Sequence, residues 1–476
     1  MRPQAYRNIL VFIVGAVVAY FVFDSLSHYL EDIKILPVPL IAVVPFVLLL
    51  ASIAIVPFIN RHWWEKRYPL VSLTLGAVIV AYYVIAVHNT PRLFLTLYEF
   101  TSFISLIGSL FVVSGGVHLR IRGKAAPHEN VILLAIGAVI SNILGTTGAS
   151  MLLIRPYLRV NKFRIKGYHV VFFIFVVSNI GGALTPIGDP PLFLGYLKGV
   201  PFFWLISRVW YIWALTVGLV LLVFYIIDSY SLRKATRRVH ELAAQHEEPE
   251  VTGLHNIAFL AVILGAVFVE KPIMLREILM WSAAIASYYT TKQEIHKKND
   301  FNFIPIKEVA ILFAGIFATM IPALDWLELN SQSLGIVVPG QYFWGTGVLS
   351  SFLDNAPTYL NFLSAAFGLH GANVDNMEHM RVMVDLATPA SLGLPNPLRP
   401  GAVMINADTW RYVQAISMGA VFFGANTYIG NGPNFMVKSI SEQAGVECPS
   451  FFGYMVKYSI PILIPIFVIV WLLFFL

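Results

Sequence analysis

Long apolar runs separated by short polar loops dominate this sequence. Most runs approach the twenty residues that a helix needs to cross a bilayer. Eleven of them predict spanning helices, near residues 9–29, 37–58, 69–88, 96–118, 168–196, 208–228, 256–271, 276–291, 303–324, 411–437 and 454–475. Two further apolar runs, 129–153 and 343–367, are interpreted from the charges that flank them.

Basic residues mark the cytoplasmic side of short loops. The run 129–153 lies between two basic loops, 120–124 and 155–166, so it enters and leaves the membrane on one side. Its polar, glycine-containing centre suits such a turn, because irregular backbone is tolerated at membrane depth when protein covers it. The run 343–367 lies between acidic segments that we expect outside, which carry Asp325, Glu328, Asp375, Glu378, Asp385 and Asp408. The sequence therefore predicts two re-entrant hairpins that enter from opposite faces.

A repeated motif supports the same division. Residues 182–193 read GALTPIGDPPLF and residues 424–435 read GANTYIGNGPNF, with Gly, Ala, Thr, Ile, Gly, Pro and Phe at matching positions. Glycine and proline disfavour a continuous helix, so both runs, 168–196 and 411–437, are predicted to be broken helices. Helices broken at corresponding positions of two halves point to the binding site of a transporter.

The expected fold is an all-α polytopic membrane protein with an inverted-topology repeat, its N-terminus inside and its C-terminus outside. Residues 1–36 form an extra helix, which we expect to be retained because no convincing cleavage site follows it. The first repeat covers 37–228 and the second 256–476. The polar segment 229–255 is expected to be a cytoplasmic linker.

Composition narrows the class further. Of the 476 residues, 58% are hydrophobic and 12% are charged, and the mean hydropathy is +0.73, which indicates a membrane protein. The single cysteine, Cys448, excludes internal disulfides and cysteine-rich metal sites. The net charge of +6 is assigned to cytoplasmic loops, and no nucleic-acid-binding motif is present.

Hydroxyl, amide and carboxylate side chains are concentrated at the hairpin tips and helix breaks. Such oxygen ligands suit sodium or an exchangeable proton. The candidate ion- or substrate-binding residues are Ser141, Asn142, Thr146, Thr147, Asn179, Thr185, Gly188, Asp189, Asp354, Asn355, Thr358, Asn426, Thr427, Gly430, Asn431 and Asn434. Sodium is assigned to Asn142, Asp189, Asp354 and Asn355, and no cofactor is expected beyond sodium or protons.

Structural roles compete with this interpretation at several positions. The glycines and prolines could serve only packing or kinks. Asn142, Asn355 and Asn426 could cap broken helices, a role compatible with ion binding. Asp189 and Asp354 could be protonated or paired with a buried cation, and Glu99 could be structural. Arg155 and Lys198 are expected to snorkel to the membrane interface.

The motifs SNILGTTGASMLL, SNIGGALTPIGDPP, SSFLDNAPTYL and GANTYIGNGPN resemble the ion-transporter superfamily over nearly the whole chain. This group includes sodium/proton antiporters, divalent-anion/sodium symporters, citrate–metal symporters and arsenite permeases. The resemblance implies eleven helices with two hairpins, a dimeric scaffold and a transport region that moves as an elevator. Asn179 followed by Asp189 is similar to the antiporter branch. Asp354-Asn355 departs from the Ser-Asn-Thr triplet of the dicarboxylate branch, and the first tip lacks the acidic residues common in antiporters.

The leading hypothesis is a secondary transporter that exchanges sodium for protons, not an enzyme. The alternative is sodium- or proton-coupled symport of citrate or another dicarboxylate. An intramembrane aspartyl protease is a distant alternative, because Pro186 replaces the first glycine of its Gly-x-Gly-Asp pattern. A passive channel is also left open. The expected setting is a homodimer in the lipid bilayer of a bacterial inner membrane.

Overall fold

The computed structural model describes residues 15, 21, 34–120, 125–234 and 250–476. The predicted first helix, 9–29, lies almost wholly outside the described residues, as does most of the linker 229–255. The α-helices before the linker are α2 (Val44–Ile59), α3 (Arg61–Tyr82), α4 (Thr90–Gly115), α5 (Pro127–Val160), α6 (Gly167–Val176), α7 (Pro190–Leu197) and α8 (Phe202–Arg233). Those after it are α10 (Asn256–Ala266), α11 (Leu275–Thr290), α12 (Gln293–Lys298), α13 (Ile304–Asn330), α14 (Pro339–Ser350), α15 (Asn355–Leu369), α16 (Met377–Met383), α17 (Trp410–Phe423), α18 (Gly432–Gln443), α19 (Phe451–Tyr454) and α20 (Ile464–Phe474).

Short irregular elements complete the chain. The 3-10 turns are η2 (Leu40–Val43), η4 (Ile180–Leu184), η5 (Ser331–Leu334), η6 (Ala390–Leu392) and η7 (Gly424–Asn426), and the π-helical segments are η3 (Tyr83–Val87) and η8 (Met455–Leu463). Strands β1 (His118–Arg120) and β2 (Glu250–Thr252) pair antiparallel, with Leu119 opposite Val251. This pairing joins the loop before α5 to the last part of the predicted linker 229–255.

Among the described residues, eight helical segments are long and apolar enough to cross a membrane. One of them is α5, which does not run straight. Its end residues Asn130 and Asn161 exchange amide hydrogen bonds of 2.9 and 2.8 Å. A straight helix would hold these residues about 45 Å apart. The chain therefore folds back within α5 and forms a helical hairpin, here called hairpin 1.

The break in hairpin 1 is at Gly145, where φ is 72° and ψ is 156°. This backbone conformation is essentially restricted to glycine. The second hairpin, hairpin 2, consists of α14 and α15 and turns at residues 351–354. Both hairpins extend a few residues beyond the predicted runs 129–153 and 343–367.

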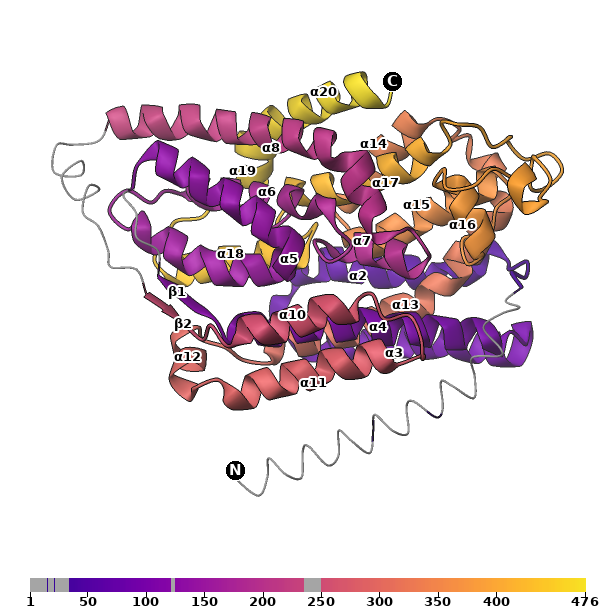
Figure 1. Cartoon of the computed structure of the whole chain (residues 1–476), viewed down its shortest axis with the longest axis horizontal. Coiled ribbons are helices and arrows are strands. Elements are labelled where there is room, and N and C mark those ends of the chain that lie inside the picture. Colours follow the sequence, from indigo (N-terminus) through magenta and orange to yellow (C-terminus); the bar gives the residue numbers. More distant parts are fainter. Residues whose placement is uncertain (1–14, 16–20, 22–33, 121–124, 235–249) are drawn as a thin grey trace.

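Figure 1 shows the helices in two layers. The site layer contains both hairpins, the broken helices α6–α7 and α17–α18, and α8, α19 and α20. The support layer contains α2, α3, α4, α10, α11 and α13. The structure is thus all-α apart from one short strand pair in the described residues, as the sequence predicted for a membrane protein.

Helices α6 and α17 form the centre of the site layer. Every residue from Tyr168 to Val176 and from Tyr412 to Phe423 is buried. A helix that is apolar on all sides is expected to be enclosed by protein or lipid. Here protein encloses both helices, so the breaks that follow them are held in the interior of the fold.

Candidate functional site

Both repeated motifs interrupt their helices. Helix α6 ends at Val176 and α7 begins at Pro190, whereas α17 ends at Phe423 and α18 begins at Gly432. Thr185 (φ −133°, ψ 155°) and Thr427 (φ −140°, ψ 168°) lie in the extended region between them. The prolines that follow start the next helices, where the missing N–H has no helical partner to lose.

Thr185 and Thr427 make the same hydrogen bonds in the two halves. Thr185 Oγ1 donates to the carbonyl of Asn142 at 2.6 Å, and Thr427 Oγ1 donates to that of Ser351 at 2.5 Å. Each hydroxyl also accepts the amide of the glycine three residues later, at 3.1 Å in both cases. Each threonine thus connects a helix break by a hydrogen bond to the tip of the hairpin in its own half.

Asp189 lies where the four irregular segments meet, and none of its surface is exposed. Its carboxylate accepts hydrogen bonds from Thr146 Oγ1 at 2.7 Å, Asn355 Nδ2 at 2.5 Å and Asn431 Nδ2 at 2.9 Å. Thr146 belongs to the tip of hairpin 1, Asn355 to hairpin 2 and Asn431 to the second break. One carboxylate therefore connects both hairpins and both halves of the chain.

All three donors to Asp189 are neutral, and no Lys, Arg or His among the described residues forms an ion pair with it. Asp189 and Asn431 occupy matching positions of the repeated motif, so the two halves differ here by one ionisable oxygen. A buried carboxylate without a basic partner is costly unless a proton or another cation neutralises it. The centre of the fold is accordingly suited to hold a cation.

A second set of amides surrounds this centre. Asn179 Nδ2 donates to Asn434 Oδ1 at 2.7 Å and so joins the first break to the second. Asn434 Nδ2 in turn donates to the carbonyls of Gly424 and Thr427 at 2.8 and 2.9 Å. The unwound backbone thereby recovers partners that a continuous helix would have provided.

Three buried amide oxygens close to the breaks accept no hydrogen bond. They are Oδ1 of Asn179, Asn355 and Asn426. Buried polar atoms are rarely left without a partner, because the loss of hydration is not recovered. Since all three are acceptors, the ligand that would satisfy them is a proton donor or a cation.

Asn142 and Ser141 connect hairpin 1 to the first helix break by hydrogen bonds within the first half. Asn142 Nδ2 donates to the carbonyls of Ala138 and Gly181, and its Oδ1 accepts the amide of Leu184. Ser141 Oγ donates to the carbonyl of Val177 at 2.7 Å. The side-chain oxygen of Asn142 is thus occupied by the backbone in this arrangement.

Asp354 is close enough to act on Asp189 electrostatically, but its hydrogen bond goes elsewhere. It caps α15, where its Oδ1 accepts the amide of Ala356 at 3.0 Å, and the neighbouring Asn355 points to Asp189. Thr358 Oγ1 donates to the carbonyl of Asp354 at 2.9 Å. Successive residues of a helix point about 100° apart, which explains why adjacent tip residues have different surroundings.

Two cavities reach the site from different sides. A cavity of about 30 Å³ is lined by Thr146, Thr147, Gly188 and Asp189, which leaves room for one water molecule or small ion. A cavity of about 600 Å³ lies between the layers beside the tip of hairpin 2. Its polar lining includes Arg61, Glu65, Glu308, Asp354, Asn431 and Lys438. The cavity beside hairpin 2 is thus much the larger of the two.

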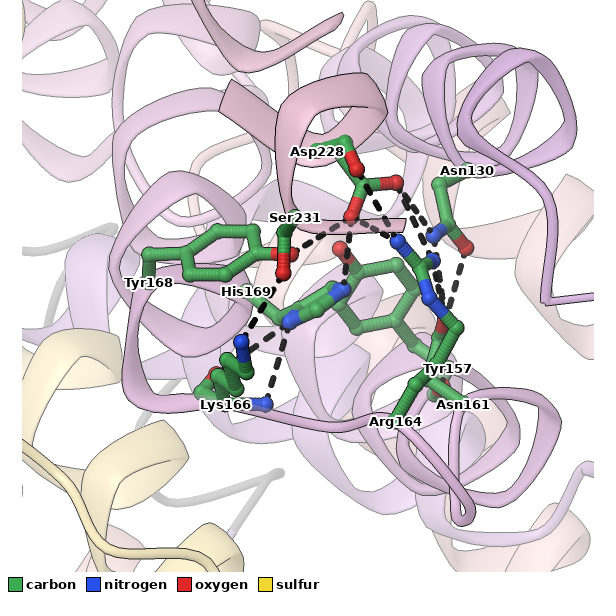
Figure 2. A network of polar contacts seen from close by, with 9 residues as sticks. All are labelled: Asn130, Tyr157, Asn161, Arg164, Lys166, Tyr168, His169, Asp228 and Ser231. Atoms are coloured by element: carbon green, nitrogen blue, oxygen red, sulfur yellow. Dashed lines mark hydrogen bonds and ion pairs between the residues drawn. The ribbon is translucent and has the colours of Figure 1, made fainter. Parts of the chain in front are cut away.

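The open ends of hairpin 1 are fixed by a polar network around Asp228, shown in Figure 2. Asp228 is fully buried and pairs with Arg164, while Tyr168 Oη donates to it at 2.6 Å. His169 Nδ1 accepts the amide of Lys166, so its Nε2, which lies 3.2 Å from Asp228 Oδ1, carries the ring proton of the neutral form. The network joins hairpin 1, α6 and α8 into one unit.

The network also changes the picture of the basic loop that follows hairpin 1. Arg164 belongs to the basic loop 155–166, yet its side chain pairs with Asp228 and only 8% of its surface is exposed. The pair could not be predicted from the sequence, because Asp228 lies 64 residues further along the chain.

Other predicted site residues are placed as follows. Gly188 accepts the amide of Thr146 through its carbonyl at 2.8 Å, Gly430 donates to Thr427, and Asn426 Nδ2 donates to Ser351 Oγ at 2.9 Å. Ser351 was not selected from the sequence, although it follows Ser350 at the second tip as Asn142 follows Ser141 at the first. That local likeness is the signal by which it could have been found. In the described ranges, no group of three or more His, Cys, Asp or Glu residues is arranged so that it could hold a metal ion.

Comparison with known proteins identifies the family. The family model CitMHS_2, whose description reads "putative citrate transport", matches residues 36–475. No curated protein matches the sequence. The match confirms the resemblance to the ion-transporter superfamily and supports an integral membrane transporter rather than an enzyme. The chain belongs to the CitMHS_2 citrate-transport family.

Proposed function

We propose that this protein is an ion-coupled secondary transporter that exchanges sodium for protons at Asp189. The observation that carries the proposal is the environment of Asp189, a fully buried carboxylate with three neutral hydrogen-bond donors and no basic partner among the described residues. An ionised group in such a place is functional by default in a membrane protein.

Sodium and protons compete for the same oxygen. The ionised carboxylate attracts sodium, and the unpartnered amide oxygens of Asn355 and Asn179 supply further ligands of the kind that hard cations prefer. The protonated carboxyl group carries no charge and offers fewer lone pairs. Binding of one ion therefore releases the other, which is the requirement for exchange.

The two layers supply a route for alternating access. Arg61 belongs to a basic loop, 61–67, between two predicted spans, and basic residues mark the cytoplasmic side of such loops. Arg61 also lines the larger cavity. This arrangement supports an inward-facing state in which the larger cavity connects the site with the cytoplasm. Movement of the site layer against the support layer would expose Asp189 to the other side, as in an elevator built from inverted repeats.

The test uses purified full-length protein in proteoliposomes that contain a pH-sensitive dye. A sodium pulse outside should make the lumen more alkaline, because entering sodium drives protons out. Asp189→Asn should abolish this response. Asp408→Asn is the matched control, since Asp408 is exposed and its ion-pair partner among the described residues is Arg411 on the surface. A sodium response in Asp189→Asn equal to that of the wild type would reject the proposal.

Cation-coupled citrate symport is the second candidate. It is favoured by the family description and by Arg61 and Lys438 in the 600 Å³ cavity, a volume typical of small-molecule sites. In this case the cation at Asp189 would neutralise part of the charge of the substrate. Sodium-dependent uptake of radiolabelled citrate, without a proton flux driven by sodium alone, would select symport over exchange.

A further inference from the structure

A buried cluster of charged side chains connects the two layers at the ends of α7 and α15 that lie away from Asp189. Lys198, directly after α7, pairs with Glu99 of α4 at 2.6 Å and with Asp375 at 2.5 Å. Arg92 of α4 pairs with Asp375 and, at 2.9 Å, with Asp325 of α13. Tyr83 Oη also donates to Asp325 at 2.7 Å.

The cluster contradicts two expectations from the sequence. Lys198 does not snorkel to an interface, since only 4% of its surface is exposed. Asp325 and Glu328 do not lie in an external loop, because both are buried within α13, at 0% and 4% exposed. Their partners are distant in the sequence, so no local pattern predicted these contacts.

Acidic groups outnumber basic groups in this cluster. Two basic side chains, Arg92 and Lys198, face four acidic ones, Glu99, Asp325, Glu328 and Asp375. Arg399 adds a third positive charge nearby, where it donates to the backbone carbonyls of Glu328 and Gly368 but to no carboxylate. One negative charge remains in excess even when Arg399 is counted. An uncompensated charge in the interior costs several kcal/mol, so a buried group becomes neutral instead.

Glu328 is the carboxyl group that lacks a basic partner. Its only hydrogen bond from the described residues is from the amide of Val374, at 3.4 Å. The other three carboxylates each form an ion pair with Arg92 or Lys198. Burial opposes the ionisation of Asp375, but Arg92 and Lys198 together lower its pKa to about 2, so Asp375 stays charged. A proton on Glu328 balances the cluster.

We propose that Glu328 is a second proton-binding site, separate from Asp189. Its proton neutralises the excess negative charge in the buried contact between the site layer and the support layer. The half-helices that begin beside Asp189 and Asn355 are α7 and α15. Lys198 and Asp375 follow the far ends of these helices and contact α4 of the support layer. Loss of the proton from Glu328 leaves one negative charge without compensation and loosens this contact. The inference concerns the chain itself and holds whichever ion or substrate Asp189 serves.

Infrared spectroscopy of the full-length protein in lipid membranes tests this site, because a protonated carboxylic acid has a carbonyl band that a carboxylate lacks. At neutral pH the wild type should show such a band. Asp189 contributes to the band as well, so Glu328→Gln should lose one component of it, which appears in the difference spectrum between the wild type and the variant. Glu442→Gln is the matched control, since Glu442 is exposed and pairs with Lys438. Its spectrum should retain the band.

Asp325→Asn provides an independent test if Glu328→Gln does not fold. Removal of one negative charge beside Arg92 should make ionisation of Glu328 easier, so the band should disappear at a lower pH than in the wild type. The proposal is overturned if the wild type has no such band at neutral pH, if the band is as strong in Glu328→Gln as in the wild type, or if Asp325→Asn leaves its titration unchanged.

Discussion

The contact between Asp189 and Asn431 allows a charge swap at the centre of the site. These residues occupy matching motif positions, and Asn431 Nδ2 lies 2.9 Å from Asp189 Oδ1. Asp189→Asn removes the only ionisable group in this contact. Asn431→Asp adds a second one, and the double variant returns to one carboxylate and one amide in reversed positions.

The expected size of the effect follows from the neutral surroundings of Asp189. A cation about 4 Å from a carboxylate gains about 4 kcal/mol at an effective dielectric constant of 20. No other charged group contacts Asp189 among the described residues, and the more distant charge of Asp354 replaces only part of this attraction in Asp189→Asn. A loss of about 4 kcal/mol corresponds to a nearly thousand-fold weaker sodium affinity, since every 1.4 kcal/mol is about tenfold.

The assay is the sodium dependence of proton exchange in proteoliposomes, measured over a range of pH. Asp189→Asn should show no saturation at sodium concentrations that saturate the wild type. Asn431→Asp should become active only at higher pH, because two carboxyl groups in contact share one proton and release it less readily. The double variant should recover part of the exchange that Asp189→Asn loses.

Two results would refute this reasoning. A wild-type sodium dependence in Asp189→Asn would show that the carboxylate does not bind the coupling ion. A double variant that folds but transports no better than Asp189→Asn would show that positions 189 and 431 are not equivalent in the site.

Three further predictions concern the support of the site, each measured by thermal unfolding in detergent. Asp375→Asn should lower the free energy of unfolding by roughly 2–3 kcal/mol at neutral pH, because the pKa of Asp375 is lowered to about 2 in the folded state. This stabilisation is present above the ordinary pKa of an aspartate and is lost as the pH falls through about 2. An equal loss at pH 7 and pH 2 would contradict the prediction. Gly145→Ala should lower the free energy of unfolding by about 1–3 kcal/mol, because alanine is strained in this backbone conformation. Gly432→Ala is the control and should change it little, since an added Cβ there meets nothing within 4 Å. Equal effects of the two substitutions would contradict the proposed strain. Asp228→Asn leaves the buried Arg164 without its carboxylate and should lower the free energy of unfolding by about 3–5 kcal/mol. The exposed Asp408→Asn should lower it by less than about 1 kcal/mol. Similar losses in the two variants would show that the network does not stabilise hairpin 1.

The repeated motif allowed the breaks to be located from the sequence. Glycine and proline have backbone preferences that act locally, so the extended conformations of Thr185 and Thr427 could be anticipated. The cost of a carboxylate in the membrane likewise singled out Asp189. These inferences need only the residues themselves and their immediate neighbours.

Contacts between distant segments could not be predicted in the same way. The sequence grouped Asp354 with Asn355, but one residue of helical rotation directs Asn355 to Asp189 and leaves Asp354 beside the larger cavity. The interfacial role expected for Lys198 was wrong because its partners Glu99 and Asp375 come from other helices. Pairing across the fold depends on tertiary packing, which hydropathy and charge patterns do not contain.

Equilibrium binding of radioactive sodium to the purified protein tests the central role of Asp189 most directly. Wild-type protein should bind sodium saturably, should release protons as it does so, and should bind more weakly as the pH falls. Asp189→Asn should show no saturable binding while remaining folded. Saturable sodium binding of unchanged affinity in Asp189→Asn would contradict the account.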